Sequence, residues 1–137
     1  MKAVPAGVGD SGQICLTNAP SRCIKTNGTG NQVTITSNPA DDANFTVVRN
    51  NLNNYQWQDG NGNCLREGTG GVVKIENGPC SNSDKTDWWT KVASNAYIDN
   101  LSNDAEMYTK GDASGDDVWA STTTPPSGSW VQWKVPT

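Results

Sequence analysis

The sequence repeats one series of landmarks three times, at intervals of about 40 to 45 residues. An aromatic residue followed closely by valine stands at Phe45, Trp89 and Trp133, so both steps are 44 residues. Two further landmarks recur in the same order. Each copy has a Cys or Met a few residues before a glycine, and then a short segment in which apolar and polar residues alternate. These are Cys23, Cys64 and Met107 with Gly28, Gly68 and Gly111, followed by segments that begin at Val33, Val73 and Val118. Such periodicity is typical of one supersecondary unit that cannot bury its apolar face alone. We therefore expect one domain over residues 1–137, with repeats of about 13–53, 54–95 and 96–137.

Each copy divides into four short segments with the composition of strands. The predicted strands are 13–17, 22–26, 32–37 and 44–49 in the first copy, 55–58, 63–67, 72–77 and 88–92 in the second, and 96–100, 106–110, 117–122 and 129–135 in the third. Alternation in the third strand of each copy predicts inward side chains. These are Val33, Ile35, Val73, Ile75, Val118 and Ala120. No window shows apolar residues at helical spacing. Twelve short strands in three equivalent groups predict an all-β fold, a β-trefoil, in which closure leaves no long sheet edge unpaired.

Composition narrows the class of partner. The net charge is −4 and Lys and Arg do not cluster, which argues against a nucleic-acid partner. No apolar run is long enough to span a bilayer. Residues Met1 to Gly12 lack the apolar core of a signal peptide, so we expect a mature product with an added or retained Met.

The four cysteines allow three pairings. Cys15 and Cys23 flank a turn in the first copy, and Cys64 and Cys80 flank two strands of the second. We predict the disulfides Cys15–Cys23 and Cys64–Cys80 and therefore a secreted, extracellular protein. Four reduced thiols are the alternative. A zinc site is not expected, because the chain has no His and no Cys-x-x-Cys spacing.

The middle copy resembles a repeat of the ricin-type (ricin B-like) β-trefoil lectin family. It has Asn63-Cys64-Leu65, a glycine-led strand ending at Ile75, a second cysteine at Cys80, and Asp87-Trp88-Trp89. The family's closing Gln-x-Trp is degenerate here, since the three copies read Ala43-x-Phe45, Asp87-x-Trp89 and Val131-x-Trp133. The resemblance implies the trefoil fold and non-catalytic binding of carbohydrate.

The family's sugar-binding positions are altered in this chain. The resemblance implies an Asp two residues after the first Cys of a copy, which holds two sugar hydroxyls beside a stacking aromatic ring. Those positions hold Lys25, Arg66 and Thr109. The aromatic positions hold Asn38, Gly78 and approximately Thr123. Any carbohydrate site is therefore expected to use other residues.

The faces of the strands suggest which residues those are. Trp57, Trp89 and Trp133 are predicted to lie in the core. Trp88, Trp119 and Trp130 are predicted to face outward, where a ring can stack on a sugar or contact a protein. For carbohydrate binding we select two kinds of residue, aromatic rings that can stack on a sugar and polar side chains that can hydrogen-bond its hydroxyls. They are Trp119 and Trp130, with Asp87, Asn38 and Asp117.

Catalysis and metal binding have weaker support. Without His, a Ser-His-Asp or Cys-His arrangement is impossible. Paired carboxylates can cleave glycosides, but nothing in the sequence fixes two at a useful separation. Asp112-x-Ser114-x-Asp116 and Asp59-x-Asn61-x-Asn63 space oxygen ligands as a calcium loop does, but neither continues to the Gly and Glu that complete the loop. We expect a non-enzyme without cofactor or metal.

The sequence thus favours a secreted lectin-like β-trefoil that binds a glycan or polysaccharide. A protein-binding module, such as a protease inhibitor or toxin-like factor, is the rival interpretation. In that case the turn closed by Cys15–Cys23 presents Arg22 to a trypsin-like pocket. A structural trefoil whose sites have decayed is the third.

Overall fold

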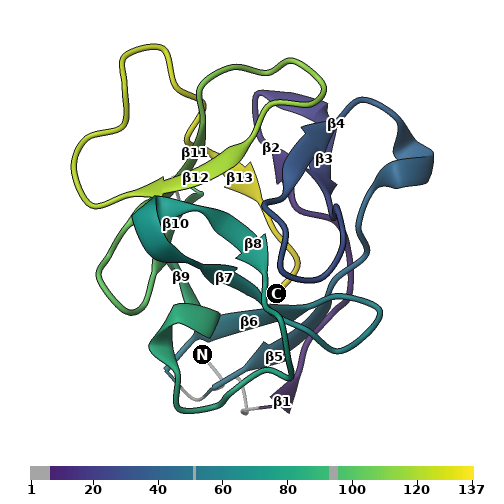
Figure 1. The fold of residues 1–137 in the computed structure, drawn as a ribbon, viewed down its shortest axis with the longest axis vertical. Helices are drawn as coiled ribbons and strands as arrows, with labels where there is room; N and C mark the ends of the chain where they lie inside the picture. Colours follow the sequence, from purple (N-terminus) through teal and green to yellow (C-terminus); the bar gives the residue numbers. More distant parts are fainter. Residues whose placement is uncertain (1–6, 51, 93–95) are drawn as a thin grey trace, which may run out of the picture.

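The computed structural model describes residues 7–50, 52–92 and 96–137, and these residues form strands with almost no helix. The expectation for the segment that starts at Met1 lies partly outside the described residues. The strands are β1 (Gly7–Val8), β2 (Cys15–Leu16), β3 (Ala19–Lys25), β4 (Thr34–Thr36), β5 (Thr46–Arg49), β6 (Asn54–Gln58), β7 (Leu65–Glu67), β8 (Val73–Ile75), β9 (Trp89–Val92), β10 (Tyr97–Asn100), β11 (Glu106–Thr109), β12 (Val118–Ser121) and β13 (Trp133–Lys134). Three single-turn 3₁₀ helices, η1 (Pro39–Asp41), η2 (Thr69–Gly71) and η3 (Lys85–Asp87), lie between them (Figure 1).

The predicted strands agree with the observed ones in place and order. Each predicted segment overlaps an observed strand, and the all-β prediction is confirmed. Two differences arise from tertiary pairing. Strand β1 has no periodic signal because it is two residues long, and it forms by pairing Val8 with Val48 of β5. Strand β3 begins at Ala19 rather than Arg22, because Ala19 pairs with Leu16 across an irregularity in β2.

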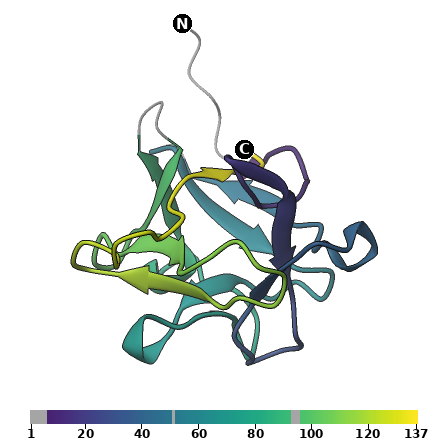
Figure 2. The ribbon, with the colours of Figure 1, turned by 90° about the horizontal axis from the view of Figure 1, so that it is seen from above.

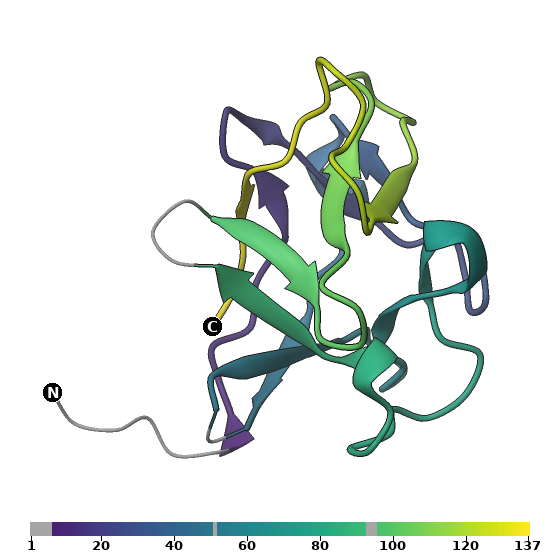
Figure 3. The same cartoon turned by 90° about the vertical axis from the view of Figure 1, so that its left-hand side faces the viewer.

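The described strands can be followed around a closed ring of neighbours. Strand β5 pairs with β6, β6 with β9, and β9 with β10, which run side by side as a hairpin in Figure 3. Strand β13 pairs with β2. Two further contacts complete the ring. The Trp133 amide donates to the Ala96 carbonyl beside β10 at 2.9 Å, and Gly12 and Phe45 exchange backbone hydrogen bonds of 3.0 and 2.8 Å.

Three hairpins from the three copies meet at one end of this ring. They are β3–β4, β7–β8 and β11–β12. The Val33 amide donates to the Val73 carbonyl at 3.0 Å, and the Val118 amide donates to the Val33 carbonyl at 3.1 Å. Val72 of the second hairpin also forms a bridge with Trp119 of the third. Equivalent residues of the three copies therefore hydrogen-bond to one another.

One hydrophobic core serves all three copies. The six inward residues predicted from alternation are buried, as are Trp57, Trp89 and Trp133. Two of these indoles repeat the same hydrogen bond, from Trp89 Nε1 to the Leu65 carbonyl at 2.9 Å and from Trp133 Nε1 to the Met107 carbonyl at 3.0 Å. A buried indole N–H needs an acceptor, and β7 in the second copy and β11 in the third each supply one.

The C-terminal segment packs against the middle copy. Trp57 Nε1 donates to the Pro136 carbonyl at 3.0 Å, and Figure 2 shows the C-terminus at the edge of the ribbon.

Both predicted disulfides are present, Cys15–Cys23 and Cys64–Cys80. Disulfides persist in oxidising compartments, so the pair fits an extracellular protein. Within the described ranges, no helix has the length and apolarity needed to cross a membrane.

Candidate functional site

A polar groove of about 650 Å³ lies between the second and third copies. Its walls come from β7 and η2 on one side and from β11 and β12 on the other. Eight aliphatic side chains of the lining can exchange hydrogen bonds with a ligand, those of Arg66, Glu67, Thr69, Thr86, Ser102, Asn103, Ser121 and Thr122. Tyr108 adds an aromatic residue to the lining. The size suits a small polar molecule, because ligand pockets commonly measure about 300–1,000 Å³.

A hydrogen bond between Glu67 and Asn103 joins the two walls. Asn103 Nδ2 donates to Glu67 Oε2 at 3.2 Å, while Asn103 Oδ1 accepts from the Ala105 amide at 3.0 Å. Glu67 is 8% exposed, and its Oε1 has no partner among the described residues. Burial raises the pKa of Glu67, and the hydrogen bond from Asn103 opposes that shift. The exposed Asn103 amide is thereby held in one orientation at the groove.

Two glycines shape the wall formed by η2. Gly70 and Gly71 have φ values of 74° and 78°, a region that favours glycine. At Gly71 a Cβ atom would lie 2.2 Å from the Ala120 carbonyl oxygen, so the loop contacts β12 through bare backbone. At Gly70 nothing lies within 4 Å of such an atom. Gly71 therefore sets how closely the two walls approach.

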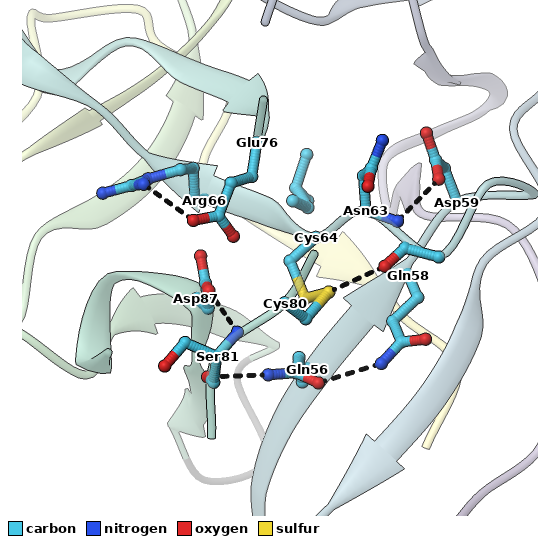
Figure 4. The surroundings of a disulfide bond; sticks show 12 residues. Gln56, Gln58, Asp59, Asn63, Cys64, Arg66, Glu76, Cys80, Ser81 and Asp87 are labelled. Atoms are coloured by element: carbon cyan, nitrogen blue, oxygen red, sulfur yellow. Dashed lines mark hydrogen bonds and ion pairs between the residues drawn. A yellow bond between two sulfur atoms is a disulfide. The ribbon is translucent and has the colours of Figure 1, made fainter. Parts of the chain in front are cut away.

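A cluster of charged side chains lies behind the groove, next to the Cys64–Cys80 disulfide (Figure 4). Arg66 Nη1 is 3.0 Å from Glu76 Oε1, and Arg66 Nη2 is 3.7 Å from Asp84 Oδ2. Asp87 is fully buried, and its Oδ2 accepts from the Ser81 amide at 3.0 Å. One carboxylate oxygen from each of Glu76, Asp84 and Asp87 lies within 4.8 Å of the others.

The cluster perturbs its own carboxyl groups. Burial, together with a hydrogen bond and like charge from Asp87, raises the pKa of Glu76 to about 7, although Arg66 opposes the shift. The pKa of Asp84 is lowered, because the hydroxyl and backbone amide of Thr86 both donate to it. Thr86 and Arg66 also line the groove, so the cluster is part of its support.

The tryptophans predicted to face outward are only partly available. Trp88 is 5% exposed, so the outward prediction was wrong. It follows η3, which packs against β7 and β10, and the strand begins only at Trp89. Trp130 is half-buried; it pairs with Thr109 and packs against the core, so its predicted outward face is only partly exposed.

Trp119 does lie on the face opposite its buried neighbours in β12, as predicted. It is half-buried, and the Lys110 ammonium lies 5.5 Å from its ring centroid. Its binding role stays a prediction.

The polar residues selected from the sequence are dispersed. Asp87, selected to hold sugar hydroxyls, has no exposed surface and lies within the charged cluster. Asn38 is exposed, but its Oδ1 caps η1 by accepting from the Ala40 amide at 3.1 Å. Asp117 is exposed at a bridge to Thr34. None of these three residues, nor Trp119 or Trp130, lines the groove.

The alternatives weighed in the sequence also have structural outcomes. Arg22 belongs to β3 rather than to a protruding loop, and its Nε donates to the Asp112 carbonyl at 2.7 Å. Asp59 Oδ1 accepts from the Asn61 and Asn63 amides, each at 2.9 Å, which is the hydrogen bonding of a turn. Ser114 and Asp116 likewise accept from backbone amides.

Sequence reasoning missed the groove because its walls come from different copies. Arg66 was noted as a substituted sugar-site position, and Glu67 follows it. The glycine pair Gly70-Gly71 before a strand was the other available signal. No periodicity indicates that Asn103 lies against Glu67, because that contact exists only after the copies pack.

No protein-family model matches this sequence, and no curated protein matches it.

Proposed function

We propose that this chain is a secreted β-trefoil of the ricin-like type that binds carbohydrate without catalysis, through the groove between its second and third copies. The trefoil assignment is supported by the closed ring of strands, the three hairpins that meet at one end, and the indole hydrogen bonds shared by two copies. Six paired barrel strands with three capping hairpins are the arrangement that the repeat predicts.

The observation that carries the binding proposal is the joined pair Asn103 and Glu67 in a groove lined by hydroxyl, amide and guanidinium groups. Sugars present adjacent hydroxyls that both donate and accept hydrogen bonds, which amides and carboxylates complement. Asn103 is exposed and oriented, so little side-chain entropy is lost when it binds. Tyr108 offers an apolar ring in the same lining.

The same lining supports a non-catalytic role. Glycoside hydrolysis commonly needs two carboxyl groups on either side of the scissile bond. Glu67 supplies the carboxylate among the described residues that line the groove. A shallow site of this kind binds a monosaccharide with a Kd of about 0.1–1 mM, or −4 to −5.5 kcal/mol. Tight binding then requires a multivalent glycan.

A glycan array followed by calorimetric titration with the best ligand tests the proposal. Replacing Asn103→Ala should weaken that ligand at least tenfold in a protein that still folds, with a lower melting temperature because the hydrogen bonds to Glu67 and from Ala105 are lost. Asn38→Ala is the matched control, because it removes the same amide from the position selected by sequence alone, and should leave affinity unchanged. Loss of binding in Asn38→Ala but not in Asn103→Ala would show that the ligand binds at Asn38 and not in the groove. No binding to any glycan would reject carbohydrate binding.

A further inference from the structure

Two buried carboxylate oxygens in the charged cluster receive no hydrogen bond when both carboxyl groups are ionised. They are Glu76 Oε2 and Asp87 Oδ1, identified within the part of the chain that the structure describes. Asp87 has no exposed surface, and in Figure 4 its carboxylate points toward that of Glu76. Leaving an anionic oxygen buried without a partner is costly, so this pair calls for a positive or hydrogen-donating group between them.

The charges of the cluster are unbalanced. Three carboxylates, Glu76, Asp84 and Asp87, converge within 4.8 Å, and Arg66 is the basic side chain that contacts them. When all three are ionised, Arg66 leaves two negative charges uncompensated. A divalent cation would bring the sum to zero. Arg66 contacts Glu76 through Oε1, so the Oε2 atom remains available.

We propose that Glu76, Asp84 and Asp87 form a binding site for a hard divalent cation of the size of Ca²⁺. Ca²⁺ binds carboxylate oxygens at about 2.3–2.6 Å, so two ligands on opposite sides of the ion lie roughly 4.6–5.2 Å apart. The separations within 4.8 Å fit inside such a coordination shell. Mg²⁺ demands shorter bonds and near-ideal octahedral geometry, which an irregular trio suits less well.

Burial is graded across the three ligands. Asp87 is fully buried, the Glu76 side chain is 13% exposed, and the Asp84 side chain is 39% exposed. An ion can therefore enter past Asp84 and keep water on that side, which supplies the ligands beyond the three carboxylates. The 3.7 Å contact between Arg66 and Asp84 is the weaker of the two ion pairs, and the bound cation would replace it.

The site would tie down the long connection between β8 and β9. Glu76 directly follows β8, whereas Asp84 caps η3 and Asp87 ends it. The Cys64–Cys80 disulfide fixes the middle of the same connection. This inference does not depend on carbohydrate binding, because none of the three carboxylates lines the groove.

The test is thermal unfolding of the chelator-treated protein in 10 mM CaCl₂, with calorimetric titration of Ca²⁺. For a Kd of about 0.1–1 mM we expect the melting temperature to rise by roughly 4–8 °C, and by less in MgCl₂. Asp84→Asn should abolish the rise, since Asn keeps an oxygen that can cap η3 but loses the charge. Glu76→Gln is the second variant if Asp84→Asn unfolds.

Asp59→Asn is the matched control. Like Asp84, Asp59 is an aspartate whose Oδ1 accepts two hydrogen bonds, in its case from the Asn61 and Asn63 amides, so the variant removes one charge from a comparable turn and should retain the full Ca²⁺ effect. The proposal is overturned if Ca²⁺ produces no rise and no calorimetric binding. It is also overturned if Asp84→Asn and Glu76→Gln both keep the rise, or if Asp59→Asn alone removes it. If Ca²⁺ produces neither a rise nor calorimetric binding, a proton shared by Glu76 and Asp87 reduces the negative charge of the cluster instead.

Discussion

Replacing Gly71→Ala should destabilise the fold much more than replacing the adjacent Gly70→Ala. Both glycines have left-handed backbone angles in the same loop, with φ of 78° and 74°. A residue with a Cβ is about 1–2 kcal/mol less stable than glycine in that region, and this loss of folding stability is common to the two variants. Any difference between them must therefore come from what the new methyl group meets.

The surroundings of the two methyl groups are opposite. At Gly71 the Cβ would lie 2.2 Å from the Ala120 carbonyl oxygen, whereas at Gly70 nothing lies within 4 Å. Relief of that overlap needs a movement of about 1 Å by backbone on one side, and overpacking of this kind costs roughly 1–3 kcal/mol. We expect about 1–2 kcal/mol of lost stability for Gly70→Ala and about 2–5 kcal/mol for Gly71→Ala.

Urea unfolding followed by tryptophan fluorescence measures both values. Because Gly71 separates the walls of the groove, Gly71→Ala should also weaken any ligand that binds there, and Gly70→Ala should not. Equal losses of stability in the two variants, within about 0.5 kcal/mol, would refute the close approach of η2 to β12.

Three further predictions concern other parts of the fold. The double variant Cys64→Ala, Cys80→Ala opens a loop with a separation of 16 residues and should lose about 3 kcal/mol in urea unfolding; an unchanged midpoint would contradict this. Asp99 lies directly opposite Glu106, and burial, with like charge from neighbouring acids, raises the pKa of both. Because the folded-state pKa is raised, the protonated carboxyl is compatible with folding at low pH, whereas the ionised carboxylate destabilises the fold as pH rises through that pKa. Asp99→Asn should therefore raise the free energy of unfolding by about 0.2–1 kcal/mol at pH 7 and leave it unchanged at pH 3.5, as measured by urea unfolding at each pH. Trp133→Phe removes the indole hydrogen bond to the carbonyl of β11 and should cost at least 1–3 kcal/mol, whereas a neutral result would show that this acceptor finds another donor.

The sequence alone determined the place of every strand except β1, because side-chain alternation is a local property. Val73 and Ile75 are buried on one face of β8, and Trp119 lies opposite its buried neighbours, as a period of two requires. The disulfides followed from the same order, since each joins cysteines that flank a predicted turn or hairpin. The large aromatic residue that ends each copy could likewise be assigned to the core.

Only the tertiary structure decided which side chains meet in the groove and in the charged cluster. Asp87 was selected as a group that holds sugar hydroxyls, but it is buried beside Glu76 at the end of η3, and Trp88 directly after it is buried too. The contact of Asn103 with Glu67 joins residues 36 positions apart from different copies. Periodicity constrains which face of its own strand a side chain occupies, whereas a groove or a charged cluster depends on how separate copies approach one another. That approach is fixed by long-range backbone pairing and by bare glycine contacts, for which the sequence carries no local signal.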